Sequence, residues 1–191
     1  MSIVFETERL MIKTSDAEMT AQVLKYYSDN RAFFEKYQPS RDDTYYTMDY
    51  QRALLMQEER NMANLTGAYY YYYLKKDPEH IIGSISFSRI RKEPYASTIF
   101  GYNIDERFQG QGYCTEACKG SIEHVFTLAP IHRIESRALM DNQKSIRVLE
   151  RLGFFYEGFE KASILINGEF RDHNRYALLN EKYNDDKSDE D

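Results

Sequence analysis

The sequence predicts a single domain of mixed α/β (α+β) class, because strand-like and helix-like segments follow one another along all 191 residues. Three observations support this prediction. Seven segments have the alternation or the aromatic composition of strands, four have helical periodicity, and no Pro-, Gly- or Ser-rich linker divides them. A chain of this length can bury one sizeable core. We therefore expect one domain over residues 1–183 and an acidic, disordered tail over residues 184–191.

The N-terminal third predicts one strand and two helices. Residues 8–15 (ERLMIKTS) alternate apolar and polar side chains, as a half-buried strand does. Ser15 precedes Glu18 by three residues, which is the spacing of a capping box, so we expect a helix from there to about Tyr27. A second helix is predicted over about 47–62.

A run of five tyrosines, Tyr69 to Tyr73, lies in the segment TGAYYYYYLKK. Tyrosine favours strands, and successive side chains of a strand point to opposite faces of the sheet. We therefore expect one set of rings in the core, while the other set lines a cavity or meets solvent. Residues 77–80 (DPEH) predict a turn, and the alternating segment 81–90 is the expected hairpin partner.

The C-terminal half predicts two helices and four further strands. One helix begins near Tyr113, and its small apolar side chains recur on one face. The other helix covers residues 141–153, with Asn142 as its N-cap. The dipeptide Asn-Gly at 167–168 is the strongest two-residue signal for a hairpin turn. Strands are expected over 96–105, 132–140, 155–166 and 169–179.

Composition argues against several kinds of partner. The formal net charge is −6, but the tail carries much of it and the remaining chain has no dense Lys/Arg stripe, so no nucleic-acid partner is expected. No apolar run approaches the roughly 18–20 residues that cross a bilayer. The first residues lack the pattern of a signal peptide. We expect a cytoplasmic protein without a membrane partner.

Cysteine and histidine do not form a metal-binding pattern. Cys114 and Cys118 are four residues apart in a predicted helix, so both thiols would lie on one face, where a disulfide constrains little. The four histidines are scattered without the spacing of metal ligands. We expect no metal, and both cysteines as small buried side chains.

The loop RFQGQGYCTE at residues 107–116 joins a predicted strand directly to a predicted helix. It is not a Walker A loop, because one residue separates Gly110 from Gly112 and no Lys-Ser/Thr follows. It is also not a Rossmann fingerprint, because position 115 is threonine rather than the third glycine. Glycines at such a junction leave backbone N–H groups and the positive end of the helix dipole open to an anion. A tight turn without a ligand is the alternative.

The ordered set of motifs resembles the GNAT superfamily of acetyl-CoA-dependent N-acetyltransferases. Residues 107–112 match its signature Gln/Arg-x-x-Gly-x-Gly/Ala, and residues 101–117 (GYNIDERFQGQGYCTEA) look like the RimJ/RimL branch of ribosomal-protein N-terminal acetyltransferases. Further similar blocks are ERL at 8–10, IGSISF at 82–87 and DNQKSIRVLERLGFFYEG at 141–158. The resemblance implies a mixed, mostly antiparallel central sheet of about six to seven strands. About four helices flank this sheet, which is splayed around the cofactor-binding strand.

The resemblance also implies a set of residues that bind acetyl-CoA. Backbone amides of the glycine loop would hold the pyrophosphate, the preceding strand would pair with the pantetheine arm, and the asparagine of the last helix would lie near the thiol. Arg147 and Lys144 could reach the phosphates, or could be ordinary exposed helix charges. The implied residues are Tyr102, Asn103, Ile104, Arg107, Gln109, Gly110, Gln111, Gly112, Tyr113, Cys114, Thr115, Asn142 and Arg147.

The implied reaction is direct attack of a neutral amine on the thioester, which needs a base for the amine and an acid for the leaving thiolate. Ser145 matches a serine proposed as that acid in the resembling branch; a hydroxyl that only packs in the helix is the alternative. The base is not assigned. Relatives carry a glutamate at the positions occupied here by Ile99 or by Ser163-Ile164. The remaining candidates are a water route, a tyrosine of the run at 69–73, or Glu169; Glu157 matches a general feature of the branch.

In such folds the acceptor enters a groove between the first two helices and the last hairpin. The expected contacts are Arg31, Phe34, Tyr37 and Tyr71, of which Phe34 and Tyr37 could instead be core residues. Three functions stay open: acetylation of a peptide or protein N-terminal amine, acetylation of a small amine such as a polyamine, an amino acid or an antibiotic, and a silent acyl-CoA-binding module. A monomer and a homodimer are both compatible with the sequence.

Overall fold

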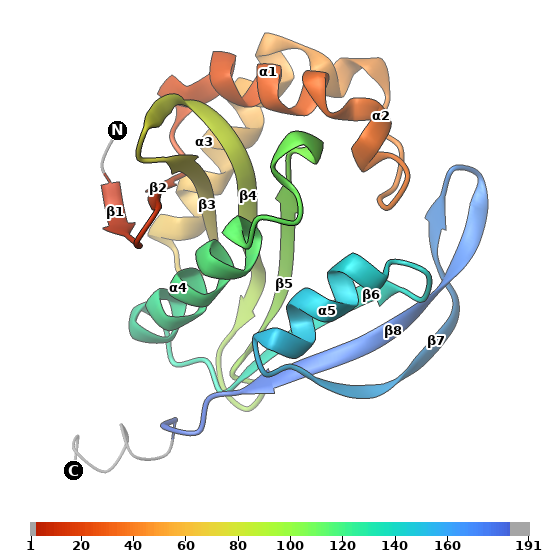
Figure 1. Cartoon of the computed structure of the whole chain (residues 1–191). Coiled ribbons are helices and arrows are strands. Elements are labelled where there is room, and N and C mark those ends of the chain that lie inside the picture. The colour runs from red at the N-terminus through yellow and green to blue at the C-terminus, as the bar shows by residue number, and fades with distance from the viewer. Residues whose placement is uncertain (1–2, 184–191) are drawn as a thin grey trace.

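The computed structural model describes residues 3–183 as one eight-stranded sheet with helices on both faces (Figure 1). The strand order is β1-β2-β3-β4-β5-β6-β8-β7, and β5 with β6 is the parallel pair. The predicted mixed, mostly antiparallel sheet is therefore confirmed. The predicted tail over residues 184–191 lies outside the described residues. The strands are β1 (Ile3–Glu6), β2 (Leu10–Thr14), β3 (Gly67–Leu74), β4 (Asp77–Arg91), β5 (Ser97–Ile104), β6 (Arg133–Leu139), β7 (Phe155–Ile166) and β8 (Glu169–Leu179).

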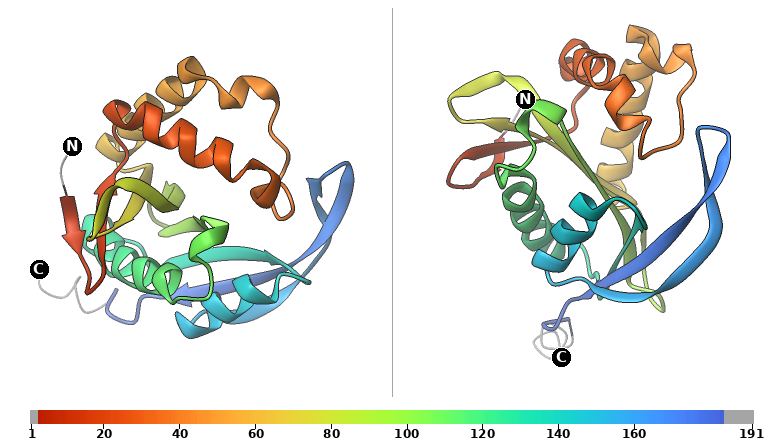
Figure 2. Two further views of the ribbon diagram at one scale, coloured as in Figure 1. Left: turned by 45° about the horizontal axis from the view of Figure 1, so that its top comes forward. Right: turned by 45° about the vertical axis from the view of Figure 1, so that its right-hand side comes forward.

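Helices α1 and α3 cover one face of the sheet, and α4 and α5 cover the other (Figures 1 and 2). None of the helices within residues 3–183 is both long and apolar enough to cross a membrane. The α-helices are α1 (Thr20–Asp29), α2 (Arg31–Phe34), α3 (Met48–Ala63), α4 (Tyr113–Leu128) and α5 (Gln143–Arg151). Short 3-10 helices are η1 (Ala17–Met19), η2 (Asp43–Tyr46) and η3 (Glu106–Phe108).

The tyrosine run forms β3, and its rings alternate between the two cores as strand geometry requires. Tyr70 and Tyr72 pack in the core beneath α4 and α5, whereas Tyr71 and Tyr73 pack in the core beneath α1 and α3. All four rings are nearly inaccessible to solvent. The prediction that successive tyrosines serve opposite faces is confirmed, and β3 ties the two helical layers to one sheet.

The sheet splits between its two central strands. β5 and β6 pair only over Ser97–Ile99 with Arg133–Glu135, and β5 then continues to Ile104 without a neighbour on that edge. The Ser136 hydroxyl donates to the Phe100 carbonyl at 3.1 Å, just past the last paired residue. The splay implied by the family resemblance is thus present, and it opens a gap within the sheet.

Three details of the predicted fold were wrong. Residues 77–80 do not form the turn of the β3–β4 hairpin but begin β4, and the turn lies at residues 75–76. The structure has eight strands rather than six or seven, because β1 is only four residues long and too short to show a reliable alternation. Ser15 does not cap a helix: the Asp16 side chain accepts from the Glu18 N–H and caps η1, while the Ser15 hydroxyl donates to Glu58. Two neighbouring residues could serve as this cap, and tertiary contact with α3 selects Asp16.

The packing of α5 on the sheet gives a test of the core. Leu149 is fully buried, so Leu149→Ala should lower the free energy of unfolding by about 2–5 kcal/mol. Leu128, at the end of α4, is 39% exposed, and Leu128→Ala should change it by less than about 0.5 kcal/mol. Urea unfolding of both variants measures the difference. Equal losses would contradict the assignment of Leu149 to the core.

Candidate active site

The glycine loop has the conformation that its two glycines permit. Gly110 has φ +73° and Gly112 has φ +83°, both in the left-handed region that favours glycine. Gly112 is the N-cap of α4 and has no side chain to bond the first free N–H groups of the helix. Within residues 3–183, the N–H groups of Gly110, Gln111 and Gly112 meet no hydrogen-bond acceptor. The loop therefore presents free donors at the positive end of a helix.

Arg9 holds this loop from the outside. Its guanidinium donates to the Gln111 carbonyl at 2.9 Å and to the Glu116 carboxylate in the first turn of α4 at 2.7 Å, and it stacks on the Tyr113 ring. Because the C=O and N–H of a trans peptide point in opposite directions, the N–H of Gly112 points away from Arg9. A Cβ on Gly112 would lie 3.2 Å from the Arg9 guanidinium. The ERL segment thus orients the loop.

Basic side chains of α5 lie beside the same loop. The Lys144 ammonium donates to the Gln109 side chain at 2.7 Å. Lys144, Arg147 and Arg151 all line the cavity that the loop opens into. Three cations together with the α4 N-terminus produce a positive rim that suits phosphate groups.

The gap between β5 and β6 forms part of a cavity of about 870 Å³. Among the residues expected to bind acetyl-CoA, Arg107, Gln111 and Tyr113 do not line it. Arg107 turns to Asp105, whose carboxylate it meets at 2.5 Å. The cofactor residues that do line the cavity are Tyr102, Asn103, Ile104, Gln109, Gly110, Gly112, Cys114, Thr115, Asn142 and Arg147.

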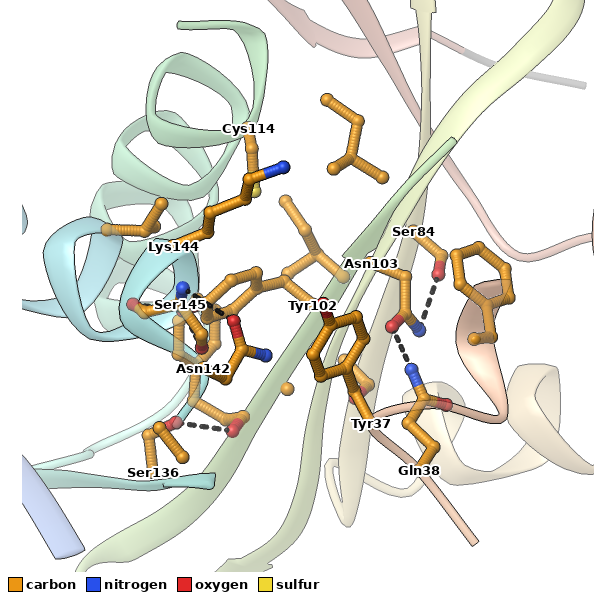
Figure 3. Close-up of a pocket in the computed structure, with 18 of the residues that line it drawn as sticks. Tyr37, Gln38, Ser84, Tyr102, Asn103, Cys114, Ser136, Asn142, Lys144 and Ser145 are labelled. Carbon is orange, nitrogen blue, oxygen red and sulfur yellow. Dashed lines mark hydrogen bonds between the residues drawn. The ribbon is translucent and has the colours of Figure 1, made fainter. Parts of the chain in front are cut away.

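Ser145 and Tyr102 meet on the α5 side of the gap (Figure 3). The Tyr102 hydroxyl donates to the Ser145 carbonyl at 3.0 Å and lies 2.8 Å from the Ser145 hydroxyl. Burial holds the pKa of Tyr102 well above its usual value, so this phenol keeps its proton. The Asn142 side chain accepts from the Ser145 N–H at 3.1 Å, which confirms it as the cap of α5.

A polar row crosses the other face of the sheet, below α1 and α3. Tyr71, Ser84 and Asn103 are register partners on β3, β4 and β5, so their side chains lie on one face. The Tyr27 hydroxyl of α1 lies 3.4 Å from the Ser84 hydroxyl. The Gln38 amide donates to the Asn103 side chain, which in turn reaches Ser84 at 3.5 Å (Figure 3). This row lines the cavity opposite the basic rim.

The expected acceptor residues are only partly brought together. Phe34, Tyr37 and Tyr71 line the cavity, whereas Arg31 does not. Arg31 instead forms ion pairs with Glu35 and Asp43 and stacks on a tyrosine ring of η2.

The hairpin of β7 and β8 closes the far side of the cavity. Asn167 in its turn donates to the Glu35 carbonyl at 2.9 Å and meets the Ser40 hydroxyl at 2.7 Å. The hairpin tip and the loop after α2 therefore lie side by side, as both views of Figure 2 show. Part of the cavity wall thus comes from the α2 loop and the last hairpin, which were expected to border the acceptor groove.

Of the residues that the sequence offered as a possible base, some line the cavity and others do not. Tyr69, Tyr70 and Tyr71 line the cavity, but Glu169 lies at the hairpin and does not. Glu157 is held by Arg133, with one contact of 2.7 Å, and this ion pair lowers the pKa of its carboxyl. Glu157 therefore has a structural contact away from the cavity.

Among the cavity residues that the sequence interpretation missed are a histidine and a glutamate. His173 on β8 is buried, and its Nδ1 lies 3.1 Å from both the Arg171 carbonyl and the Ser163 hydroxyl. Glu58 on α3 accepts from Ser15 at 2.7 Å. Glu58 lies three residues after the buried Leu55, so helical periodicity could have placed it on the inner face of α3.

Burial raises the pKa of Glu58 to about 7, although the hydrogen bond from Ser15 lowers it. Within residues 3–183 no lysine, arginine or histidine forms an ion pair with this carboxylate. A carboxyl group with this pKa changes its charge near neutral pH. It can therefore take up or release a proton under ordinary conditions.

Comparisons with known proteins agree with this geometry. The sequence profile of the acetyltransferase (GNAT) domain matches residues 9–155. The chain is 32% identical over 173 residues to the ribosomal protein uS5-alanine N-acetyltransferase of Escherichia coli (strain K12), covering 90% of this chain and 88% of that protein. A solved ribosomal-protein-S5-alanine acetyltransferase from Vibrio fischeri has a TM-score of 0.91 at 27% identity, covering 95% and 99% of the two chains. RimL, a ribosomal L7/L12 α-N-protein acetyltransferase in complex with coenzyme A, has the same fold, with a TM-score of 0.83, 23% identity and coverage of 93% and 98%.

The profile covers most of the chain, and the sequence identity extends over nine-tenths of it. The chain therefore belongs to the GNAT acetyltransferase family. Within this family it is similar to the ribosomal-protein N-acetyltransferases. It is an N-acetyltransferase, as its family resemblance predicted.

The pKa of Glu58 predicts how a variant should change stability. Its folded value of about 7 exceeds the ordinary 4.5, so the ionised carboxylate destabilises the fold. This penalty is absent below pH 4.5, grows between pH 4.5 and 7, and is complete above pH 7. Glu58→Gln removes it and should raise the free energy of unfolding at pH 8 by on the order of 1–3 kcal/mol, with a smaller gain at pH 5.

Denaturant unfolding at the two pH values measures this effect. Glu59→Gln is the matched control, because Glu59 is on the same helix, accepts from the Ala17 N–H and does not line the cavity. A gain for Glu58→Gln that is the same at pH 5 and pH 8 would contradict the raised pKa.

Proposed function

We propose that the protein transfers the acetyl group of acetyl-CoA to a primary amine, and that the amine is the N-terminus of a peptide or protein. The observation that carries this proposal is the cavity itself. It joins the free N–H groups of the glycine loop on one side of the split sheet to the polar row below α1 and α3 on the other. A donor and an acceptor that enter from opposite faces can therefore meet in the gap.

The residues present suit acetyl-CoA as the donor substrate. The free N–H groups of Gly110 and Gly112, the α4 N-terminus and the cations of α5 would hold the pyrophosphate and neighbouring phosphates. The open edge of β5 at Tyr102–Ile104 would pair with the amides of the pantetheine arm, as an exposed strand edge pairs with an extended ligand. Arg107, Gln111 and Tyr113 are assigned a positioning role in the loop.

The chemistry is direct aminolysis of the thioester. Holding the two substrates in line supplies much of the lowering of the barrier. The leaving thiolate needs a proton, and Ser145 is the proposed donor because its hydroxyl faces the gap and lies 2.8 Å from the Tyr102 phenol. Tyr102 keeps its own proton, because burial raises its pKa, so Ser145 would recover its proton from the nitrogen of the attacking amine.

The chemical class of the acceptor is inferred from the segments that border its half of the cavity and from the substrates for which the relatives are named. The acceptor half lies between the loop after α2 and the β7–β8 hairpin, two segments that meet at Asn167. Relatives with this fold are named for the N-terminal alanine of a ribosomal protein or for ribosomal L7/L12. Acetylation of a small amine and a silent acyl-CoA-binding module are the alternatives.

A thiol-release assay with acetyl-CoA tests the proposed function. The acceptors are peptides that begin with alanine or serine, the same peptides with a blocked N-terminus, and small amines including spermidine and free amino acids. We expect turnover with the free peptides and none with the blocked ones. Turnover confined to small amines would support the first alternative. Binding of acetyl-CoA without turnover on any amine would support the second.

The glycine loop predicts the effect of Gly112→Val. Valine at φ +83° is strained, and its side chain would crowd Arg9 and turn the N–H groups away from the cavity. We expect a loss of acetyl-CoA binding of at least about 100-fold by calorimetry. Gly168→Val in the β7–β8 turn is the matched control, because Gly168 has φ +81° and open space around it. Wild-type affinity in Gly112→Val would overturn the assigned pyrophosphate site.

A further inference from the structure

The charges around the cavity are unevenly distributed. The basic side chains Lys144, Arg147 and Arg151 lie on α5, beside the glycine loop. Arg41, in the segment between α2 and η2, also lines the cavity and lies over the Tyr45 ring at 5.2 Å. Arg137 is neutralised by Glu160 at 2.8 Å. Among the described residues, Glu58 is the only carboxylate that lines the cavity, and it comes from α3 on the opposite face of the sheet.

Uncharged polar groups surround Glu58. Ser15 at the end of β2 donates to it at 2.7 Å. Tyr27 on α1 and Tyr69 and Tyr71 on β3 line the same cavity, and burial raises the pKa of each, with a smaller contribution from the charge of Glu58. The neighbouring acid on α3, Glu59, turns away to the Ala17 N–H of η1. Glu58 is thus a half-buried carboxylate that accepts from the Ser15 hydroxyl and forms no ion pair within the described part of the chain.

Small and hydroxylated residues connect Glu58 to the gap. Ser84, Ser86 and Gly101 line the cavity floor between β3 and the open edge of β5, and they leave room for an acceptor or for water. The Tyr27 hydroxyl lies 3.4 Å from the Ser84 hydroxyl. Ser84 in turn meets the side chain of Asn103 on β5 (Figure 3). These contacts connect α1 to the open edge of β5, and Glu58 lines the same cavity on the same face of the sheet.

We propose that Glu58 is the group that receives the proton of the acceptor ammonium, through the hydroxyls of Tyr27 and Ser84 and the water between them. This inference rests on the proposed function, and it assigns the base that sequence comparison left open. In this relay Glu58 accepts the proton at a distance from the reacting atoms and does not contact the thioester.

The proton balance of the reaction is complete with this group. The acceptor enters as R–NH₃⁺ and gives one proton to the Glu58 carboxylate, which becomes a neutral carboxylic acid. The amine forms its bond to the acetyl carbon while the carbon–sulfur bond breaks, and the second proton of the nitrogen goes to the thiolate. Glu58 then releases its proton to solvent. The products are the N-acetyl amine, coenzyme A as thiol and one proton.

Burial makes this transfer feasible. An α-amino group has a pKa near 8, so an ordinary carboxylate with a pKa near 4.5 would be about three to four pKa units too weak as a base. With the pKa of Glu58 raised to about 7, the mismatch falls to about one unit, or about tenfold in population. A pKa of about 7 still leaves Glu58 largely ionised above neutral pH and ready to accept a proton.

His173 is the other cavity residue that could take a proton. Its Nδ1 is held by the Arg171 carbonyl and Ser163, and it lies on β8 across the gap from the hydroxyl chain. The observations favour Glu58, because it lines the cavity on the face of the sheet that carries Tyr27 and Ser84. The experiment below includes both residues so that one can be distinguished from the other.

The test compares Glu58→Gln, Glu58→Asp, His173→Gln and the control Glu59→Gln, using the best acceptor of the wild-type enzyme. We expect kcat at pH 7 to fall by about 100-fold in Glu58→Gln, with the KM for acetyl-CoA unchanged and the acidic limb of the kcat profile lost. Glu58→Asp should recover part of kcat and keep an acidic limb. Glu59→Gln should behave as wild type.

The variant Ser15→Ala provides a second test, for which the direction of the change in the pH profile is predicted. Its hydroxyl lowers the pKa of Glu58, so its removal should move the acidic limb of kcat to higher pH without abolishing it. A purely structural role of Glu58 would leave the position of this limb unchanged. The same shift should be seen for the Glu58 carboxyl resonance in a ¹³C NMR titration, with no acceptor present.

The possible outcomes distinguish the role of Glu58 from the proposed function. Turnover by the wild type with an unchanged kcat in folded Glu58→Gln overturns the inference and leaves the proposed function intact. A loss confined to His173→Gln assigns the base to His173 and also overturns the inference. A Glu58 carboxyl that titrates near 4.5 overturns it whatever the turnover. A wild type that releases no thiol with any amine overturns the proposed function, and the role of Glu58 in the reaction with it.

Discussion

The site depends on one interruption in the hydrogen bonding of the sheet. β5 and β6 run in parallel and pair over only three residues each before they separate. Every buried peptide group needs a partner, and beyond this point the inner edge of β5 has no strand to supply one. Ser136 serves the first carbonyl past the split, and the rest of the edge stays open to an extended ligand. The same separation connects the two faces of the sheet through one cavity.

The glycine loop lies at one end of this opening and is shaped by contacts far away in the sequence. Arg9 binds the Gln111 carbonyl and the first turn of α4, more than a hundred residues later. This contact turns the adjacent peptide N–H inward, so the loop is preorganised before any anion arrives. Preorganised donors need no rearrangement when the ligand binds, which is why backbone amides can replace a lysine here.

Opposite charges then mark the two ends of the cavity. The cations of α5 suit a phosphorylated donor, and the single carboxylate of α3 suits an acceptor that arrives as an ammonium ion. Between them the surface is mostly hydroxylated, although Arg41 and Arg137 also line it. With the proposed function, this division would let one cavity hold an anionic and a cationic substrate in a fixed order, and it would keep the proposed base away from the phosphates.

Local sequence patterns were enough to predict most of the elements and the conformation of the glycine loop. Strand and helix periodicity and the Gly110–Gly112 spacing are local properties, so the order of elements and the α4 N-terminus followed from residues close together in the chain. β1 was missed because four residues carry too little pattern, and Ser15 was misread because the choice of cap depends on α3. Tertiary structure alone decided which side chains share the cavity. It turned Arg107 and Arg31 to carboxylates outside the cavity, and it brought Glu58, Tyr27 and Ser84 together from three elements. Burial and neighbours set the pKa of a carboxyl group, and neither exists until the chain has folded.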